Sequence, residues 1–221
     1  MHAHAAFLRD GLDQLGLDAG LADPLLSFAQ ELLHWNRRIN LTAITDERQV
    51  LVQHVLDSLS VLPHVQGGRL MDVGSGGGLP GVLIALARPD VNVLSVESRH
   101  KKIAFQRHVA RLLGLNNFQA EACRVEAWQA DAPYPQIISR AFASLADFVT
   151  LAGVQLAPGG QMLAMKGKAE ANEREAVPTP WQVVKMPRLT VPSLSADRHL
   201  VILERGGGAH SGPHGPEEQE A

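Results

Sequence analysis

The fold of this chain is decided by the stretch from position 71 to position 81, which reads Met71-Asp72-Val73-Gly74-Ser75-Gly76-Gly77-Gly78-Leu79-Pro80-Gly81. It comes directly after an apolar run that predicts a strand and directly before a segment with helical spacing. A glycine-rich loop between a strand and a helix lets a ligand approach the backbone closely. The stretch therefore predicts a ligand-binding loop rather than a simple turn.

One class of ligand that suits this loop is a dinucleotide. Gly76, Gly78 and Gly81 satisfy the G-x-G-x-x-G spacing of dinucleotide-binding folds. Glu97 follows roughly 20 residues later, where such folds place an acid that binds the ribose. On that pattern alone, the loop would suit NAD.

A second set of features favours a different cofactor. Asp72 precedes the loop, and Gly74, Gly76 and Gly78 alternate, which makes a D-x-G-x-G-x-G string. This string looks like the first motif of the Rossmann-like methyltransferases, in which the loop backbone packs against the amino-acid end of S-adenosylmethionine. Glu97, at the end of the second predicted strand, would accept hydrogen bonds from the ribose hydroxyls of the same cofactor.

Two residues after the third predicted strand would complete such a site. Val125 would form an apolar wall beside the adenine, and Glu126 or its backbone would lie near the exocyclic amine. Glu126 is equally well explained as an acid at a helix N-terminus, where the helix dipole stabilises it.

The pattern from Arg69 onward predicts the architecture. Short apolar runs alternate with helical segments, which is typical of an α/β fold with helices on both faces of a mostly parallel sheet. We expect a Rossmann-like methyltransferase fold with seven strands. The predicted strands are 69–73, 92–97, 118–123, 136–140 and 161–166, with 181–189 and 199–204 as an antiparallel edge and helices that begin near Pro80, Arg99 and Leu145.

Three parts of the chain differ in pattern. Residues 1–65 predict an N-terminal helical extension, in which Asp23-Pro24 looks like a helix cap followed by proline in the first turn. Residues 66–205 form the methyltransferase core. Residues 206–221 are too polar and too rich in glycine and proline to fold alone, so we expect a disordered tail.

Composition narrows the class of protein. With 221 residues, of which 45% are hydrophobic, the chain can bury one substantial core. A net charge of −3 is unlike that of a free-standing nucleic-acid binder. Any RNA contact would therefore use a local patch, for which residues 99–111 are a candidate, although a solvated helix face explains this stretch as well. Its basic residues, which no acidic residue interrupts, are Arg99, Lys101, Lys102, Arg107 and Arg111.

The same survey bears on location and metals. A single cysteine, Cys123, excludes an intramolecular disulfide and a cysteine-based metal site. The N-terminus has no basic patch followed by an apolar run, and no stretch is long and apolar enough to span a bilayer. We expect a cytoplasmic protein without a metal or a membrane contact.

The residues after the strands also limit the acceptor of a methyl group. Methylation of pyrimidine carbon 5 needs a cysteine nucleophile, but Cys123 ends a predicted strand, where a small buried hydrophobe is the simpler role. Methylation of an exocyclic base amine commonly uses a D/N-P-P-aromatic loop after the fourth strand. The equivalent segment here reads Ile137-Ile138-Ser139-Arg140-Ala141-Phe142 and lacks that motif. An acceptor that is already nucleophilic, such as guanine N7, is favoured. Arg140 and Phe142 are candidates to position it, although Arg140 would equally suit a cofactor or structural carboxylate.

Several separate strings of the sequence occur together in the RsmG family, also called GidB, and the chain resembles that family over about residues 25–205. The strings are His34-Trp35-Asn36, Asn40-Leu41-Thr42, His54, Leu56-Asp57-Ser58, the glycine loop, and Ser139-Arg140-Ala141-Phe142-Ala143-Ser144-Leu145. The resemblance implies methylation of N7 of one guanosine in 16S ribosomal RNA near the decoding centre, with S-adenosylmethionine as donor. It further implies a substrate within the small ribosomal subunit or a precursor.

The resemblance also implies which residues act. The cofactor contacts would be Gly74, Leu79, Val125, Glu126 and Arg140, to which the fold argument adds Glu97 and Gly76. A polar cleft for RNA would be lined by Asn40, His54, Arg140 and Lys166, with Asn36, Thr42 and Asp57 nearby. Three alternatives stay open: a methyltransferase for another acceptor, a non-catalytic cofactor-binding assembly factor of the ribosome, and, remotely, a nicotinamide oxidoreductase.

Overall fold

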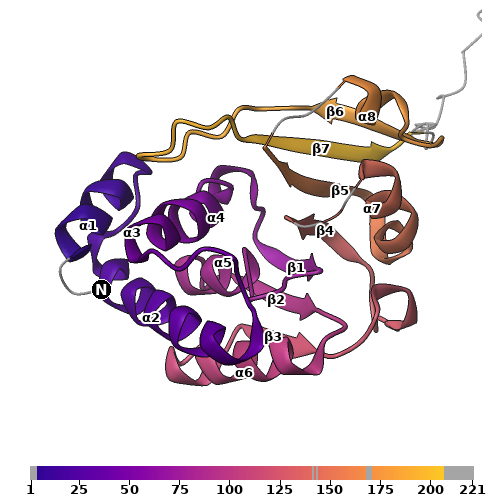
Figure 1. Ribbon diagram of the computed structural model, residues 1–221. Coiled ribbons are helices and arrows are strands. Elements are labelled where there is room, and N and C mark those ends of the chain that lie inside the picture. The colour runs from indigo at the N-terminus through magenta and orange to yellow at the C-terminus, as the bar shows by residue number, and fades with distance from the viewer. Residues whose placement is uncertain (1–3, 141, 143, 168–170, 207–221) are drawn as a thin grey trace, which may run out of the picture.

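The computed structural model describes residues 4–140, 142, 144–167 and 171–206, and it has the α/β architecture that the sequence predicts. A seven-stranded sheet with the order β3-β2-β1-β4-β5-β7-β6 runs through the centre (Figure 1). Five neighbouring strands are parallel, and β7 and β6 add an antiparallel edge. The strand order reverses between β1 and β4, and ligands of open α/β sheets bind at such a point.

Most strands agree with the predicted runs to within two residues, but β5 begins five residues earlier than predicted and β6 ends four residues earlier. Their bounds are β1 Gly68–Val73, β2 Val91–Val96, β3 Phe118–Glu121, β4 Tyr134–Ser139, β5 Leu156–Lys166, β6 Trp181–Lys185 and β7 His199–Arg205. The third strand was predicted too long, because it ends at Glu121 and leaves Cys123 in the following loop. The predicted antiparallel pairing of the last two strands is confirmed, with β7 next to β5 and β6 at the edge.

The core helices predicted near Pro80, Arg99 and Leu145 begin within one residue of those positions, whereas a fourth, short core helix was not predicted, and the N-terminal part is divided into several helices. The core helices are α5 Gly81–Ala87, α6 His100–Leu112, α7 Leu145–Ala152 and α8 Ala171–Glu175. The N-terminal part contains α1 Ala5–Gln14, α2 Ala22–Ile39, α3 Glu47–Val50 and α4 Asp57–Leu59, with a π-helical segment, η3 Leu51–Leu56, between the last two. Short 3₁₀ turns complete the set: η2 Ala19–Leu21, η4 Leu62–His64, η5 Val125–Ala127 and η6 Gly153–Gln155.

The predicted cap at Asp23-Pro24 is wrong. The 3₁₀ turn η2 runs directly into α2, so the helix begins at Ala22 and Asp23 lies within its first turn. Asp18 is the residue that caps this segment, because its side chain accepts from the backbone N–H of Gly20 at 2.8 Å. Pro24 is tolerated because the first turn of a helix leaves its N–H groups without intrahelical partners.

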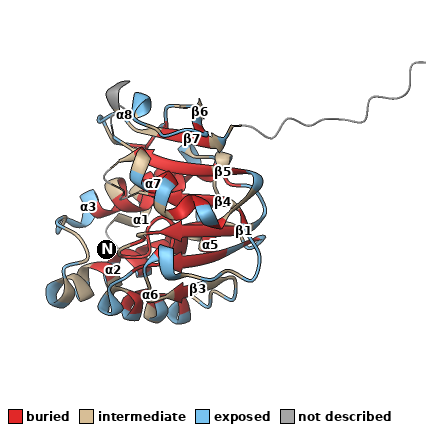
Figure 2. Cartoon of the chain, turned by 90° about the vertical axis from the view of Figure 1, so that its right-hand side faces the viewer, coloured by how far each residue is buried: buried red, intermediate tan, exposed pale blue. Residues whose placement is uncertain are grey.

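Alternating side chains of the strands fill two hydrophobic clusters, one on each face of the sheet. In β1, Leu70 belongs to the cluster with the N-terminal helices, α5 and α6, whereas Met71 belongs to the cluster with α7. In β7, Leu200 and Val201 divide in the same way. This period of two is what a strand buried on both faces requires, and Figure 2 shows the strands as the buried centre of the molecule.

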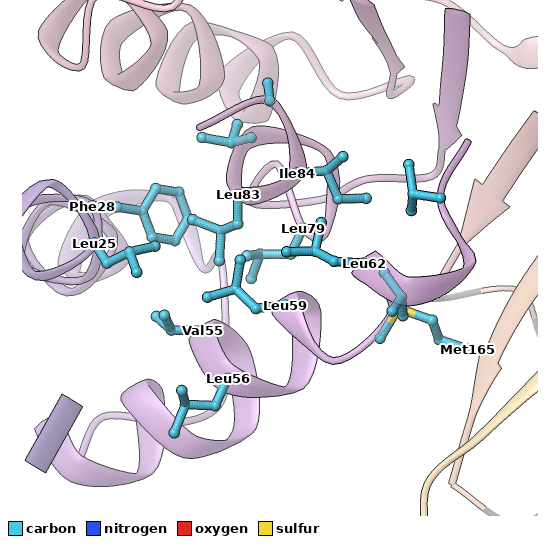
Figure 3. Close-up of a cluster of buried hydrophobic side chains, with 14 of the residues drawn as sticks. Leu25, Phe28, Val55, Leu56, Leu59, Leu62, Leu79, Leu83, Ile84 and Met165 are labelled. Atoms are coloured by element: carbon cyan, nitrogen blue, oxygen red, sulfur yellow. The ribbon is translucent and has the colours of Figure 1, made fainter. Parts of the chain in front are cut away.

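The N-terminal helices contribute to the larger of these clusters. Leu25 and Phe28 of α2 and Val55 of η3 lie with Leu83 of α5 in one buried group (Figure 3). Phe28 has no exposed surface, and its ring centroid is 6.1 Å from that of Phe105 in α6. Residues 4–65 therefore share a core with the sheet, and the division at residue 65 remains a prediction from composition.

Two predicted segments lie partly outside the described residues. They are the predicted tail, of which only Gly206 is described, and the N-terminal residues 1–10, of which the first three are not described. Ala141 and Ala143 of the family string also lie outside the described residues. Within the described residues, no helix combines the length and the apolar character needed to cross a membrane.

Candidate active site

The glycine loop between β1 and α5 keeps its backbone open to a ligand. Gly74, Gly76 and Gly78 all have positive φ, at 68°, 55° and 77°, which favours glycine at each position. Among the described residues, a Cβ on Gly74 would meet no atom within 4 Å, and one on Gly76 would meet only Lys102 Nζ at 3.7 Å. A Cβ on Gly78 would instead be 2.5 Å from Val82 Cγ2. The first two glycines thus leave a cradle free, whereas the third allows the helix to pack.

Asp72 supports the loop from below. Its Oδ2 accepts from the backbone N–H of Gly81 at 2.8 Å, which ties the end of β1 to the start of α5. Its Oδ1 has no hydrogen-bond partner among the described residues, and the side chain is fully buried. Burial raises the pKa of Asp72 to about 7, although the Gly81 N–H and the charge of Arg140 oppose the shift.

This raised pKa gives a stability prediction for Asp72→Asn. Between pH 3.8 and about 7 the folded protein keeps a proton on Asp72 that the unfolded chain releases, so the stability of the unsubstituted protein falls as pH rises. The amide has no such proton. The free energy of unfolding of the variant minus that of the original protein should therefore increase from pH 4 to pH 8 in chemical denaturation. A difference that is constant with pH would show that Asp72 is already ionised at pH 4 in the fold.

Gln106 of α6 holds the loop from the side. This side chain has no exposed surface, and its Nε2 donates to Ser75 Oγ and to the carbonyl of Gly76, both at 2.8 Å. Its Oε1 accepts from Ser95 Oγ at 2.7 Å. The helical spacing of α6 gave no sign of this role, because a glutamine on a buried helix face is only recognised when its partners are known.

Glu97 lies beside the loop, as the fold argument predicts. It follows β2, is 8% exposed, and accepts from the backbone N–H of Gly76 at 3.1 Å and of Arg99 at 3.0 Å. Lys102 Nζ is 4.0 Å from Oε2, the oxygen that accepts from Gly76. The carboxylate is thereby fixed at the carboxyl end of the second strand.

Val125, Glu126 and Leu79, which the family resemblance implies as cofactor contacts, differ in their burial and in what their side chains pack against. Val125 is buried against the cluster that contains α7, and Glu126 is exposed beside it in η5. Leu79 packs its side chain into the larger core, next to Leu59 and Leu62 (Figure 3). A ligand contact of Leu79 would therefore involve its backbone.

Arg140, directly after β4, is surrounded by groups from η3 and α4. Its Nη1 donates to the carbonyl of Gln53 at 3.3 Å and lies 3.6 Å from Asp57 Oδ2. Its Nη2 is 3.3 Å from His54 Nδ1, and His54 Nε2 is 2.7 Å from Thr42 Oγ1. Burial, together with the charge of Arg140, lowers the pKa of His54 to about 4, so His54 is neutral at physiological pH.

A second arginine completes this cluster and was not predicted. Arg198, which directly precedes β7, donates from Nε to Asp57 Oδ1 at 2.9 Å. Burial raises the pKa of Asp57, and the charges of Arg140 and Arg198 oppose that shift. The two residues of this pair are 141 positions apart, and no local motif marks Arg198.

The predicted polar cleft is divided into two separate hollows. One, of about 310 Å³, lies over the arginine cluster and is lined by Ile44, Gln53, His54, Asp57, Arg140, Met165, Lys166, Gly167 and Arg198. The other, of about 650 Å³, lies at the end of α2 and is lined by Gln30, Leu33, His34, Asn36, Arg37, Asn40, Thr42, Thr45 and Glu47. Asn40 thus does not line the hollow of His54, Arg140 and Lys166, because the segment after α2 separates them.

Asn36 has a structural role in that segment. Its Oδ1 accepts from the backbone N–H groups of Leu41 and Thr42 at 2.7 and 2.9 Å. Its Nδ2 donates to the carbonyl of Thr42 at 2.8 Å. Its amide is thus engaged within the chain, so this residue shapes the loop rather than contacting a substrate.

Phe142 and Lys166 also interact with the protein itself. The ring of Phe142 lies 5.1 Å from that of Phe148 in α7, centroid to centroid. Lys166 Nζ donates to the Phe142 carbonyl at 3.1 Å and pairs with Glu173. Phe142 therefore packs against the protein in this structure and does not stand as a free stacking platform.

Part of the basic stretch 99–111 contacts the protein itself. Arg107 donates to the carbonyl of Ala120 and pairs with Glu121, while Arg99, Lys101 and Arg111 are exposed.

Cys123 does not have the environment of a nucleophile. Burial and the charge of Glu121 raise the pKa of its thiol, which is the opposite of what an activated nucleophile needs.

Together, this sheet order and loop define the class of Rossmann-like methyltransferases. The chain is structurally similar to the N-methyltransferase NodS from Bradyrhizobium japonicum WM9, with a TM-score of 0.52 and 11% identity, over 74% of this chain and 100% of that chain. At this identity the likeness concerns the fold.

The family follows from sequence comparison. The family model of GidB, described as rRNA small subunit methyltransferase G, matches residues 22–201, and the chain belongs to that family. It is 46% identical over 206 residues to the ribosomal RNA small subunit methyltransferase G of Azoarcus sp. (strain BH72), covering 92% of this chain and 97% of that protein. The enzyme of the same name from Aromatoleum aromaticum (strain DSM 19018 / LMG 30748 / EbN1) is 49% identical, with 91% and 99% covered.

Proposed function

We propose that this protein transfers the methyl group of S-adenosylmethionine to N7 of one guanosine in 16S ribosomal RNA near the decoding centre. The observation that carries the proposal is the open backbone cradle at Gly74 and Gly76 in a member of the GidB family. We place the reaction in the cytoplasm, on the small ribosomal subunit or on a precursor of it.

The cofactor would be held by residues at the ends of three neighbouring strands and by Arg140 after a fourth. The backbone of Gly74, Gly76 and Leu79 would face the amino-acid end of the cofactor. The space beside the two glycines, where a Cβ would lie, is open to this ligand. The other proposed contacts are Glu97 with the ribose hydroxyls, Val125 and Glu126 with the adenine, and Arg140 with the carboxylate.

Little acid–base chemistry is required of the protein. The bound cofactor supplies an electrophilic methyl group on a sulfonium, and guanine N7 has a lone pair in the plane of its ring. The chain therefore has to place N7 in line with the methyl group and to exclude water. A neutral His54 and a buried Asp57 beside Arg140 suit such positioning, because neither has to gain or lose a proton during the transfer.

The acceptor class is tested by transfer of a labelled methyl group to small subunits from cells that lack this enzyme. We expect label in material that ribonuclease releases and protease does not. Label that protease releases would mean a protein acceptor. If cofactor binds but no label is transferred to any under-methylated subunit or RNA, the protein is a non-catalytic assembly factor.

Gln106→Leu should weaken cofactor binding without unfolding the protein. The substitution removes the hydrogen bonds to Ser75 and Gly76 that fix the loop, while Ser75 and Ser95 can still pair with each other. Because each hydrogen bond contributes roughly 1 kcal/mol, we expect the Kd for S-adenosylmethionine to rise about tenfold in calorimetric titration.

Gln119→Leu is the matched control, since Gln119 is exposed on β3 and its side chain bonds to no described residue other than Glu121. Its Kd should be unchanged. An unchanged Kd in a folded Gln106→Leu protein would instead show that other contacts hold the loop.

A further inference from the structure

A row of acidic and basic side chains leads away from the glycine loop. Asp72 lies under the loop and is coupled electrostatically to Arg140. Arg140 lies 3.6 Å from one oxygen of Asp57, and the other oxygen accepts from Arg198 at 2.9 Å. In this row, Arg140 is next to the proposed cofactor cradle and Arg198 is at the far end.

The hollow at the far end of the row has an excess of positive charge. Of its ionisable lining groups, Arg140, Lys166 and Arg198 are cationic, Asp57 is the carboxylate, and His54 is neutral because its pKa is lowered to about 4. Glu173, which is not a lining residue, compensates Lys166. The lining of this hollow of about 310 Å³ therefore holds three cations and one carboxylate.

Arg198 still has donors for a ligand. Its Nε is used by Asp57 and its Nη1 by the carbonyl of Asp197 at 3.0 Å. Among the described residues, Nη2 makes no hydrogen bond, and the side chain is 23% exposed. A guanidinium that is anchored at two nitrogens and open at the third is oriented in advance, which favours a fixed anionic partner.

We propose that Arg198 binds a backbone phosphate of the RNA next to the target guanosine, and that Asp57 positions Arg198 for this contact. The inference rests on the proposed function, because it takes RNA as the acceptor. A phosphodiester fits the hollow better than a base does, since it is anionic and the lining holds more cations than carboxylates. This contact would set the register of the strand, while Arg140 faces the cofactor.

The test compares Arg198→Met, Arg198→Lys and the control Arg188→Met on small subunits that lack the methyl mark. Arg188 belongs to the same connection between β6 and β7, is 70% exposed and pairs with Asp197, but it does not line the hollow. The KM for subunits is measured over a range of KCl concentrations, and the Kd for S-adenosylmethionine and the melting temperature are measured for each variant.

For Arg198→Met we expect a KM about tenfold higher, and a slope of log KM against log salt that is smaller by about 0.7–0.9, the value for one lost phosphate contact. The Kd for S-adenosylmethionine should stay within about twofold of the original value. Arg198→Lys should keep the salt slope, because it keeps the charge, even though it loses the geometry of the Asp57 pair. Arg188→Met should change neither quantity.

Two outcomes would overturn the assignment of Arg198. An unchanged salt slope in Arg198→Met, with transfer by the original protein intact, would mean that Arg198 supports the fold and not the RNA. A large rise in the Kd for S-adenosylmethionine would assign the hollow to the cofactor carboxylate. Failure of the proposed function looks different, because the original protein would then transfer no methyl group to RNA.

Discussion

Replacing Gly74 by alanine should weaken S-adenosylmethionine binding at least about 100-fold and abolish methyl transfer, while the protein stays folded. The Cβ would point into space in which no atom of the described residues lies within 4 Å, and this is the space that we assign to the cofactor. A positive φ of 68° adds backbone strain of roughly 1–2 kcal/mol. Alanine is preferable to valine here, since a branched side chain at this φ would destabilise the fold as well.

Gly16→Ala separates the two effects. Gly16 has the same φ of 68°, and a Cβ there would equally meet no atom of the part of the chain that the structure describes within 4 Å, but Gly16 lies after α1, away from the loop. Both variants should lose similar stability in denaturant titrations, and only Gly74→Ala should lose cofactor affinity in calorimetry. Normal affinity in a folded Gly74→Ala protein would mean that the cofactor lies elsewhere.

Phe28→Ala should cost about 3–5 kcal/mol of the free energy of unfolding, the range for emptying a buried aromatic site. Phe28 has no exposed surface and contacts Phe105 across the boundary between α2 and α6. Because the N-terminal helices share this core with the sheet, we expect one cooperative transition in guanidinium, shifted to lower concentration. Far-ultraviolet circular dichroism and tryptophan fluorescence should report the same midpoint.

Leu112→Ala serves as the control for this substitution. Leu112 is at the end of α6 and is 53% exposed, so its loss should change the free energy of unfolding by no more than about 0.5 kcal/mol. Two separate transitions in Phe28→Ala, or a loss below about 1 kcal/mol, would show that the N-terminal helices fold apart from the sheet.

The strands and the glycine loop were predictable because their signals are local. A short apolar run such as that of β1, whose last four residues are buried, can be recognised from neighbouring residues, and a loop with glycines at 74, 76 and 78 needs no distant partner to be recognised. Glu97 could be placed beside the loop for a related reason, since the carboxyl ends of adjacent parallel strands meet at one edge of the sheet.

The features that escaped prediction depend on contacts between distant segments. Arg198 reaches Asp57 across 141 positions, and Gln106 becomes meaningful only once α6 lies against Ser75. Likewise, the two polar hollows are separated by the segment after α2, which the side chain of Asn36 shapes. Hydrophobic periodicity contains no information on such polar pairings, which exist only after the chain has folded.

The identity of the methylated atom is tested by a single labelling experiment. The protein would be incubated with isotope-labelled S-adenosylmethionine and small subunits that lack the mark, after which the RNA is digested and analysed by mass spectrometry. We predict label in a single 7-methylguanosine of the 16S RNA. Label in any other nucleoside, or no label despite measurable cofactor binding, would contradict the proposed function.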